Sequence, residues 1–153
     1  MKVKLNKKAP NFKLSSTSSK NFELSKLKNG LVIYFYPKDN TPGCTLETID
    51  FSKLYKKFKS LNYEIVGISK DSIESHLGFK KRFKVPFQLL SDDKLKVQKK
   101  YGVWGMKSFL GKKFMGTIRS TILINKGKIL KSWSNVRVNG HAQEVLDFIK
   151  SQK

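Results

Sequence analysis

The chain has 153 residues, a formal net charge of +21 and one cysteine. The lone cysteine excludes an internal disulfide, a CxxC redox pair and a thiolate zinc cluster, and no apolar run approaches the roughly 20 residues of a membrane span. The two histidines, His76 and His141, lack metal-ligand spacing, so we expect no metal, no other cofactor and no membrane partner.

The first predicted elements are two short strands, residues 12–14 and 21–24, which flank a serine-rich stretch and form an N-terminal hairpin. Ser25 is expected to cap one helical turn that ends near Asn29-Gly30. The apolar run of residues 31–36 is typical of a buried core strand.

A helix is predicted to follow this strand after a short turn. Thr41-Pro42 has the residue types of an N-cap and of the first helical position. Phe51, Leu54, Tyr55 and Phe58 then recur at helical spacing, which places one apolar face against a sheet.

The remaining elements alternate between strand and helix patterns. We predict a second core strand at residues 63–69, a helix from the cap Ser72 to about Phe83, a short strand at 87–90, a short helix at 92–100, strands at 117–125 and 128–136 joined around Asn125-Lys126-Gly127, and a closing helix at 141–151.

This order of elements predicts one domain over residues 1–153, because a chain of this length buries a sizeable core. Strands that alternate with helices, followed by a hairpin and a helix, give an α/β sandwich around a mixed sheet. The pattern is compatible with a thioredoxin-like fold. The N-terminus lacks the apolar segment and cleavage site of a leader, so we expect a cytoplasmic protein.

Cys44 is the most informative residue, because it falls in the first turn of the helix predicted from Thr41-Pro42. Free backbone N–H groups and the helix dipole favour negative charge there, and such positions lower a thiol pKa from about 8.5 into roughly the 3.5 to 7.5 range. A buried structural cysteine is the alternative. Thr41, Pro37 and Gly43 favour a reactive thiol, because a core cysteine needs neither a nearby hydroxyl, a rigid strand exit nor close backbone approach.

Several motifs resemble those of one known family. The pattern Pro37-x-x-x-Thr41-x-x-Cys44 resembles the peroxidatic motif of peroxiredoxins, and the surrounding residues resemble the bacterioferritin comigratory protein, or peroxiredoxin Q, branch. The resemblance covers nearly the whole chain. Further motifs in the order of that branch are Gly67-Ile68-Ser69, Leu90-Ser91-Asp92, Tyr101-Gly102-Val103-Trp104-Gly105 and Arg119 before Ile122-Leu123-Ile124.

The resemblance implies a thioredoxin-like (peroxiredoxin) α/β fold and a thiol-dependent peroxidase. Cys44 would attack hydrogen peroxide or an organic hydroperoxide and become a sulfenic acid. Arg119 would stabilise the thiolate and the peroxide, while the Thr41 hydroxyl and the Gly43 and Cys44 N–H groups align the substrate. Pro37 would shield the sulfur from water.

Two of these residues also have plainer explanations. Arg119, inside the apolar run 116–124, could simply lie on the solvent side of a strand. Glu47, one turn after Cys44, could hydrogen-bond to the active-site arginine or be an ordinary surface carboxylate. Trp104 is expected to pack rather than to take part in the chemistry.

The chain departs from a common form of the branch, which has a resolving cysteine five residues after the first. That position is Ile49, and no second thiol exists. The sulfenic acid would therefore be reduced by an external thiol such as thioredoxin, glutaredoxin or glutathione. The resemblance leaves the oligomeric state open between a monomer and a weak homodimer.

Two other function classes remain open at this point. A cysteine hydrolase would need His141 as the base for Cys44. A basic, thioredoxin-like, redox-sensing or polyanion-binding protein would use the positive charge, which is +7 in residues 1–30, +4 in residues 31–90 and +10 in residues 91–153. Because only three of the 32 basic residues are arginine, we expect no specific nucleic-acid partner and only weak polyanion binding at low salt.

Overall fold

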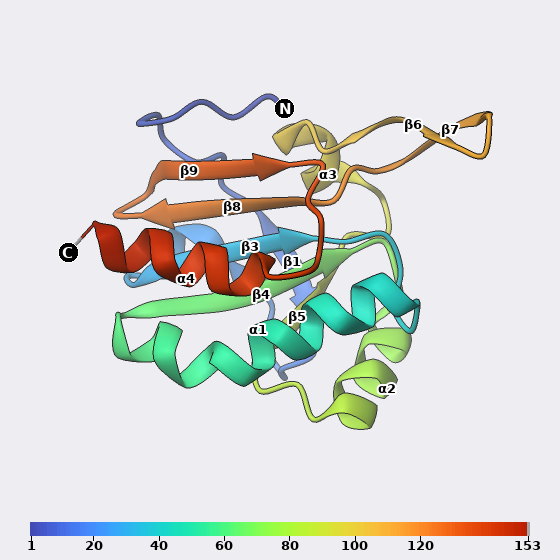
Figure 1. The fold of residues 1–153 in the computed structure, drawn as a ribbon. Coiled ribbons are helices and arrows are strands. Elements are labelled where there is room, and N and C mark those ends of the chain that lie inside the picture. Colours follow the sequence, from blue (N-terminus) through green and yellow to red (C-terminus); the bar gives the residue numbers. More distant parts are fainter. Residues whose placement is uncertain (153) are drawn as a thin grey trace.

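The computed structural model describes residues 1–152 of the chain, and Figure 1 shows their fold. The strands are β1 (Lys13–Ser16), β2 (Phe22–Glu23), β3 (Gly30–Phe35), β4 (Tyr63–Ser69), β5 (Gln88–Ser91), β6 (Trp104–Phe109), β7 (Lys112–Thr117), β8 (Ser120–Asn125) and β9 (Lys128–Ser134). The helices are the 3-10 helix η1 (Leu24–Lys26) and the α-helices α1 (Pro42–Ser60), α2 (Ile73–Phe83), α3 (Lys96–Tyr101) and α4 (His141–Ser151).

Seven strands form one mixed sheet in the order β2-β1-β5-β4-β3-β8-β9. The central strands β3, β4 and β5 run parallel, while the outer strands pair antiparallel. Parallel neighbours need crossover connections, and α1 and α2 supply them. The C-terminal ends of β3 and β4 therefore lie at the same edge of the sheet, beside the N-terminal ends of α1 and α2.

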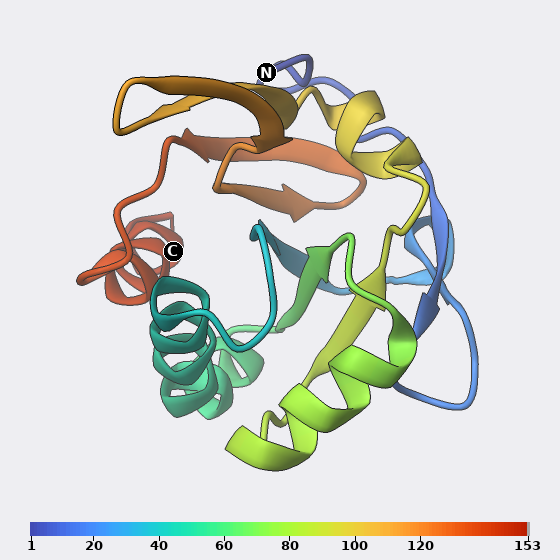
Figure 2. The same ribbon diagram turned by 90° about the vertical axis from the view of Figure 1, so that its right-hand side faces the viewer.

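Helices cover the two faces of this sheet unequally (Figures 1 and 2). Helices α1, α2 and α4 pack on one face, where Tyr34, Phe51 and Phe79 are fully buried. The other face is covered by α3 and by the N-terminal segment, with Phe35 and Tyr101 at its centre. Because β3 is buried on both faces, its sequence is a continuous apolar run rather than an alternating one.

Most of the predicted elements are confirmed. The strand β4 and the helix α4 have the predicted bounds, and the N-terminal hairpin forms from β1 and β2. Ser72 caps α2 as predicted, because its side chain accepts a hydrogen bond from the N–H of Ser75 at 3.2 Å. The α/β thioredoxin-like sheet flanked by helices is thus the observed fold.

The predicted cap Ser25 is wrong. It lies inside η1, where its hydroxyl donates to the Glu23 carboxylate, and Gly30 already belongs to β3. The helix predicted from residue 92 begins only at Lys96. The Asp92 side chain precedes it and accepts hydrogen bonds from the N–H groups of Val97 and Gln98 at 3.2 and 2.8 Å.

The strand predicted over residues 117–125 is also wrong, because two strands of different sheets share that stretch. Strand β7 ends at Thr117 and β8 begins at Ser120, so Ile118 and Arg119 lie between them. The Ile118 N–H donates to the carbonyl of Val103, and the Arg119 carbonyl accepts from Val136. This break turns Arg119 out of the sheet ladder.

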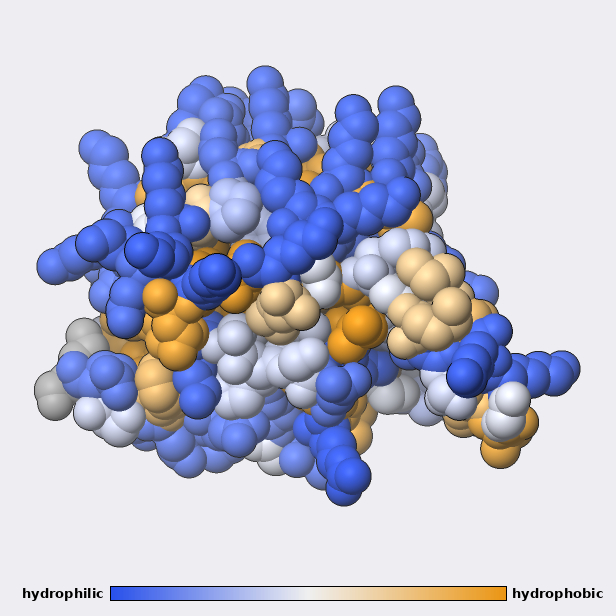
Figure 3. Space-filling view, turned by 90° about the horizontal axis from the view of Figure 1, so that it is seen from above, coloured by the Kyte–Doolittle hydropathy of each residue, from blue (hydrophilic) through white to orange (hydrophobic). Residues whose placement is uncertain are grey.

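A whole hairpin was not predicted from the sequence. Strands β6 and β7 form a separate two-stranded sheet that projects beyond the main one (Figure 1). Seen from above, the same projection lies on the right of Figure 3, where hydrophobic and hydrophilic residues lie side by side on its surface. Exposed apolar residues on both sides give no clean alternation, so the period-2 signal is missing.

Among residues 1–152, no helix combines the length and the apolar character needed to cross a membrane.

Gly67 in the centre of β4 allows a close approach that holds α1 on the sheet. An added Cβ would lie 2.8 Å from the ring of Tyr34 and 2.9 Å from Leu89, and the Tyr34 hydroxyl bonds to Thr48 of α1 at 2.9 Å. We expect Gly67→Ala to lower the free energy of unfolding by about 1–3 kcal/mol through overpacking. The matched control Gly78→Ala, on an open face of α2, should raise it by up to about 1 kcal/mol. Equal effects of the two substitutions in urea unfolding would contradict this account.

Candidate active site

The single cysteine lies at the start of α1, just after the turn that connects β3 to this helix. Thr41 is the N-cap of α1 and Pro42 its first residue, so Cys44 lies in the first turn as predicted, with only 1% of its surface exposed. The first N–H groups of a helix have no partner within it. The Thr41 side chain does not cap them, because its hydroxyl donates to the carbonyl of Lys38 at 2.7 Å.

Arg119 joins the sulfur to a buried carboxylate. Its Nη2 donates to the Cys44 Sγ at 3.3 Å, and its Nη1 donates to Oε1 of Glu47 at 2.7 Å. The break between β7 and β8 aims the guanidinium at the first turn of α1. Gly43 makes room for it, because a Cβ at this residue would lie 3.3 Å from Nη2. The solvent-facing alternative for Arg119 is therefore wrong.

The charge of Arg119 is secured by its neighbours. Burial alone would lower the pKa of Arg119, but Glu47 and Cys44 outweigh it and raise this pKa above its ordinary value. The guanidinium therefore stays positive throughout the accessible pH range and can stabilise negative charge on the sulfur.

Glu47 is a buried carboxyl rather than a surface one. It is 1% exposed, and burial raises its pKa to about 7 although Arg119 acts in the opposite direction. Its Oε2 has no hydrogen-bond partner within the described residues. Glu47 thus holds Arg119 through one oxygen and titrates near neutral pH.

A cavity of about 380 Å³ opens beside this cluster. Arg119 lines it together with Met106, Lys107, Ser108, Ile118, Asn135 and Val136. Burial lowers the pKa of Lys107, and the charge of Arg119 adds to this effect. No local sequence pattern singled out Lys107, because the hairpin that carries it was not predicted.

The sequence-predicted site residues thus separate into two groups. Cys44, Gly43, Glu47 and Arg119 come together in direct contact. Pro37 and Thr41 lie half-buried on the turn that leads from β3 into α1.

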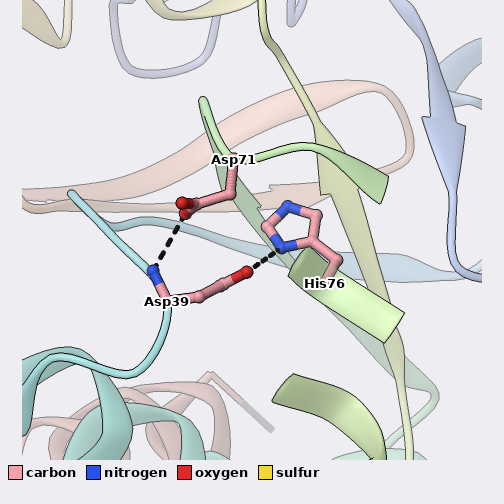
Figure 4. Close-up of side chains that lie close together, drawn as sticks. All are labelled: Asp39, Asp71 and His76. Carbon is pink, nitrogen blue, oxygen red and sulfur yellow. Dashed lines mark hydrogen bonds and ion pairs between the residues drawn. The ribbon is translucent and has the colours of Figure 1, made fainter. Parts of the chain in front are cut away.

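A second buried cluster holds this turn in place (Figure 4). Asp39 accepts from the Tyr36 hydroxyl at 2.6 Å and from the Ser75 hydroxyl at 2.8 Å, and its Oδ2 lies 2.7 Å from Nδ1 of His76. The N–H of Asp39 donates to the Asp71 carboxylate at 2.9 Å. The imidazole and the Asp39 carboxylate are both buried, so their contact is shielded from water.

This cluster links the turn before Cys44 to α2 and β5. The other nitrogen of His76, Nε2, donates to the carbonyl of Leu90 at 2.9 Å. Asp39, Asp71 and His76 are close enough to hold a metal ion. Protein groups already occupy the atoms that face one another, so we interpret the cluster as a hydrogen-bonded support. His76 shares the helix face of Phe79, three residues later, and this spacing could have marked it as a buried histidine.

His141 is engaged elsewhere. Its Nε2 bonds to the Thr121 hydroxyl at 2.7 Å and its Nδ1 to Glu144 at 3.0 Å, so neither nitrogen bonds to Cys44. Burial lowers the pKa of His141. The histidine stabilises the start of α4 and is not placed as a base for the cysteine.

We expect the effects of substitutions at Asp39 and His76 on the free energy of unfolding to be strongly coupled. We expect His76→Leu to cost about 3 kcal/mol of unfolding free energy, because it leaves a buried carboxylate without its partner. The double variant Asp39→Asn with His76→Leu should cost clearly less than the sum of the single changes. Urea unfolding of the three variants measures this coupling, and additivity within about 0.5 kcal/mol would contradict it.

Comparisons with known proteins agree with this geometry. Residues 5–132 match the AhpC/TSA family. Peroxiredoxin Bcp of Bacillus subtilis is 41% identical over 152 residues, which cover 98% of this chain and 97% of that protein.

Solved structures give the same result. The structure of a PrxQ mutant from Xylella fastidiosa superimposes with a TM-score of 0.93 at 34% identity, covering 99% of this chain and 98% of that one. The bacterioferritin comigratory protein of Xanthomonas campestris, described with alkyl peroxide reduction activity, gives 0.87 at 36% identity over 92% and 91% of the two chains. With a lone cysteine held by an arginine at the start of α1, this chain belongs to the AhpC/TSA family and is a thiol-dependent peroxidase of its Bcp/peroxiredoxin Q branch.

Proposed function

We propose that Cys44 is the peroxidatic residue and that Arg119 activates it. The observation that carries this assignment is the 3.3 Å contact between the guanidinium and the sulfur at the N-terminus of α1. The Cys44 thiolate attacks the terminal oxygen of a hydroperoxide, an S–O bond forms, and the O–O bond breaks. The leaving oxygen takes up a proton and departs as water or an alcohol, and the sulfur remains as sulfenic acid.

Each neighbouring group has a role that follows from its position. Arg119 stabilises the thiolate and the charge that develops on the leaving oxygen. The free N–H groups of Gly43 and Cys44 and the Thr41 hydroxyl orient the peroxide, since the hydroxyl oxygen keeps acceptor capacity while donating to Lys38. Pro37 keeps water from the sulfur. Glu47 is a positioning residue that holds Arg119.

The substrate is a hydroperoxide, and we infer that alkyl hydroperoxides are among those reduced. The activity described for the Xanthomonas campestris relative supports this choice. The cavity beside Arg119 offers Met106, Ile118 and Val136 as apolar contacts for an alkyl chain.

The reductant must come from another molecule. Cys44 is the only cysteine in the chain, and Ile49 occupies the position five residues after it. A thiol of thioredoxin, glutaredoxin or glutathione would attack the sulfenic acid, release water and form a mixed disulfide, which a second thiol then reduces.

Loss of Arg119 should slow the oxidation of Cys44 far more than it alters the fold. We expect Arg119→Ala to lower the rate constant about 10²-fold or more and Arg119→Lys to lower it less, because lysine keeps the charge but loses the planar fork. Stopped-flow mixing with hydrogen peroxide and cumene hydroperoxide, with dimedone trapping, measures both. His141→Ala is the matched control and should keep the wild-type rate. A normal rate in Arg119→Ala would overturn the assignment.

The raised pKa of Glu47 makes stability depend on pH. Because its pKa is about 7 in the folded protein and 4.5 as the ordinary value, its contribution is fully present below pH 4.5 and is lost as the pH rises through about 7. We therefore expect wild type to lose up to about 3 kcal/mol relative to Glu47→Gln between pH 4.5 and 8. Urea unfolding of both proteins across this range provides the test. A constant difference would show that Glu47 does not titrate there.

A further inference from the structure

The β6–β7 hairpin carries most of the exposed apolar side chains of the molecule. Five of the nine large hydrophobic residues exposed in the described chain lie on its 14 residues. Their exposed fractions are 61% for Met106, 66% for Phe109, 87% for Leu110, 45% for Phe114 and 50% for Met115. Exposed apolar groups gathered in one place mark an interaction surface.

The two-residue turn at the end of the hairpin places a leucine in a backbone conformation that is unfavourable for it. Leu110 and Gly111 have φ angles of 52° and 79°, a two-residue turn in which asparagine followed by glycine is the preferred pair. A leucine in this left-handed conformation is strained, and here it is also almost fully exposed. Burial of the Leu110 side chain against a partner would offset both the backbone strain and the exposure of its apolar surface.

The apolar side chains point to both sides of the hairpin. Met106 pairs with Met115 across the strands, so these two side chains share one face. Side chains alternate between faces along a strand, which places Phe109 and Phe114 together on the opposite face. Leu110 occupies the end between them. A fluid lipid layer can surround the tip of the hairpin and bury both faces together, which a flat protein surface cannot do.

The positive charge around the hairpin indicates what kind of surface it would bind. Residues 94–143 contain twelve lysines and arginines and no aspartate or glutamate. Lys112 and Lys113 lie exposed on β7 of the hairpin itself, and a lysine in such a place can lay its aliphatic stem along apolar groups while its ammonium group reaches outward. A second copy of this chain, at +21, would be repelled, so the complementary surface is anionic.

We propose that the β6–β7 hairpin docks on an anionic lipid bilayer, with Phe109 and Leu110 inserted among the headgroups and the lysines bound to lipid phosphates. Insertion stays shallow, since the free edges of a two-stranded sheet cannot enter the hydrocarbon core. The sequence-based expectation of no membrane partner rested on the lack of a spanning segment, which a docked hairpin does not need.

Docking brings the active site to the membrane surface. Met106, Lys107 and Ser108 of β6 also line the cavity beside Arg119. The hairpin that enters the headgroup layer therefore also forms one wall of that cavity.

Vesicle binding tests the proposal without using peroxidase turnover, so its failure leaves the proposed function standing. Co-sedimentation with vesicles of phosphatidylglycerol and phosphatidylcholine, at about 0.15 M ionic strength, should show binding that phosphatidylcholine alone does not support. Phe109→Thr with Leu110→Asn keeps the turn and the charge, and it should weaken binding about tenfold or more through lost apolar burial. Leu77→Gln, a matched change of a leucine 47% exposed on α2, should have no effect.

Three results would overturn the proposal. Absence of binding to anionic vesicles would exclude the bilayer as the partner. Equal binding by wild type and the double variant would show that the lysines alone adsorb to charged surfaces. A double variant that keeps vesicle binding but loses affinity for an acidic thiol protein such as thioredoxin would make the hairpin a protein-docking surface instead.

Discussion

The guanidinium of Arg119 lies between a sulfur and a buried carboxylate, and the arrangement of the molecule around α1 follows from that contact. The Arg119 side chain is only 17% exposed, and a charged group that is mostly withdrawn from water is stabilised when it is paired and hydrogen-bonded. Glu47 holds the guanidinium at 2.7 Å, and Cys44 is the reactive partner at 3.3 Å. The charges of Arg119 and Glu47 would each be unfavourable at these positions without the other.

The fold meets this requirement through backbone features rather than through the sheet alone. The break at Ile118 and Arg119 releases the arginine from the ladder, and Gly43 leaves space for it. On the other side, Asp39 and His76 tie the turn before α1 to α2. A peroxide that reaches the cysteine therefore meets donors that are already in place, which is the condition for electrostatic catalysis.

The sequence predicted the elements that have strong local signals. Strand β4 and helix α4 were predicted with their observed bounds, because apolar runs and helical periodicity are local properties. The contact of Arg119 with Cys44 was expected from the family resemblance, the contact with Glu47 was one of two alternatives left open, and both are observed. The break at Arg119 was missed, since an apolar run does not reveal where one sheet ends and the next begins.

Other features depend on tertiary contacts that no local pattern encodes. Asp39 and His76 are 37 residues apart, and only the parallel arrangement of β3 and β4 brings them together. The β6–β7 hairpin lacks the alternation of a half-buried strand, because neither of its faces packs fully on the core. The exposure of both faces removes the alternating pattern from the sequence, and it also leaves most of the exposed large apolar residues of the described chain on this hairpin.

The proposed role of Cys44 requires that its surroundings make this thiol far more reactive toward peroxide than an ordinary one. The most direct test measures the second-order rate constant for oxidation of the reduced protein by hydrogen peroxide in stopped flow, with no other thiol present, and the same constant for free N-acetylcysteine at the same pH. We predict that Cys44 reacts orders of magnitude faster than the free thiol and that dimedone traps its sulfenic acid. A rate constant no larger than that of the free thiol would contradict this prediction.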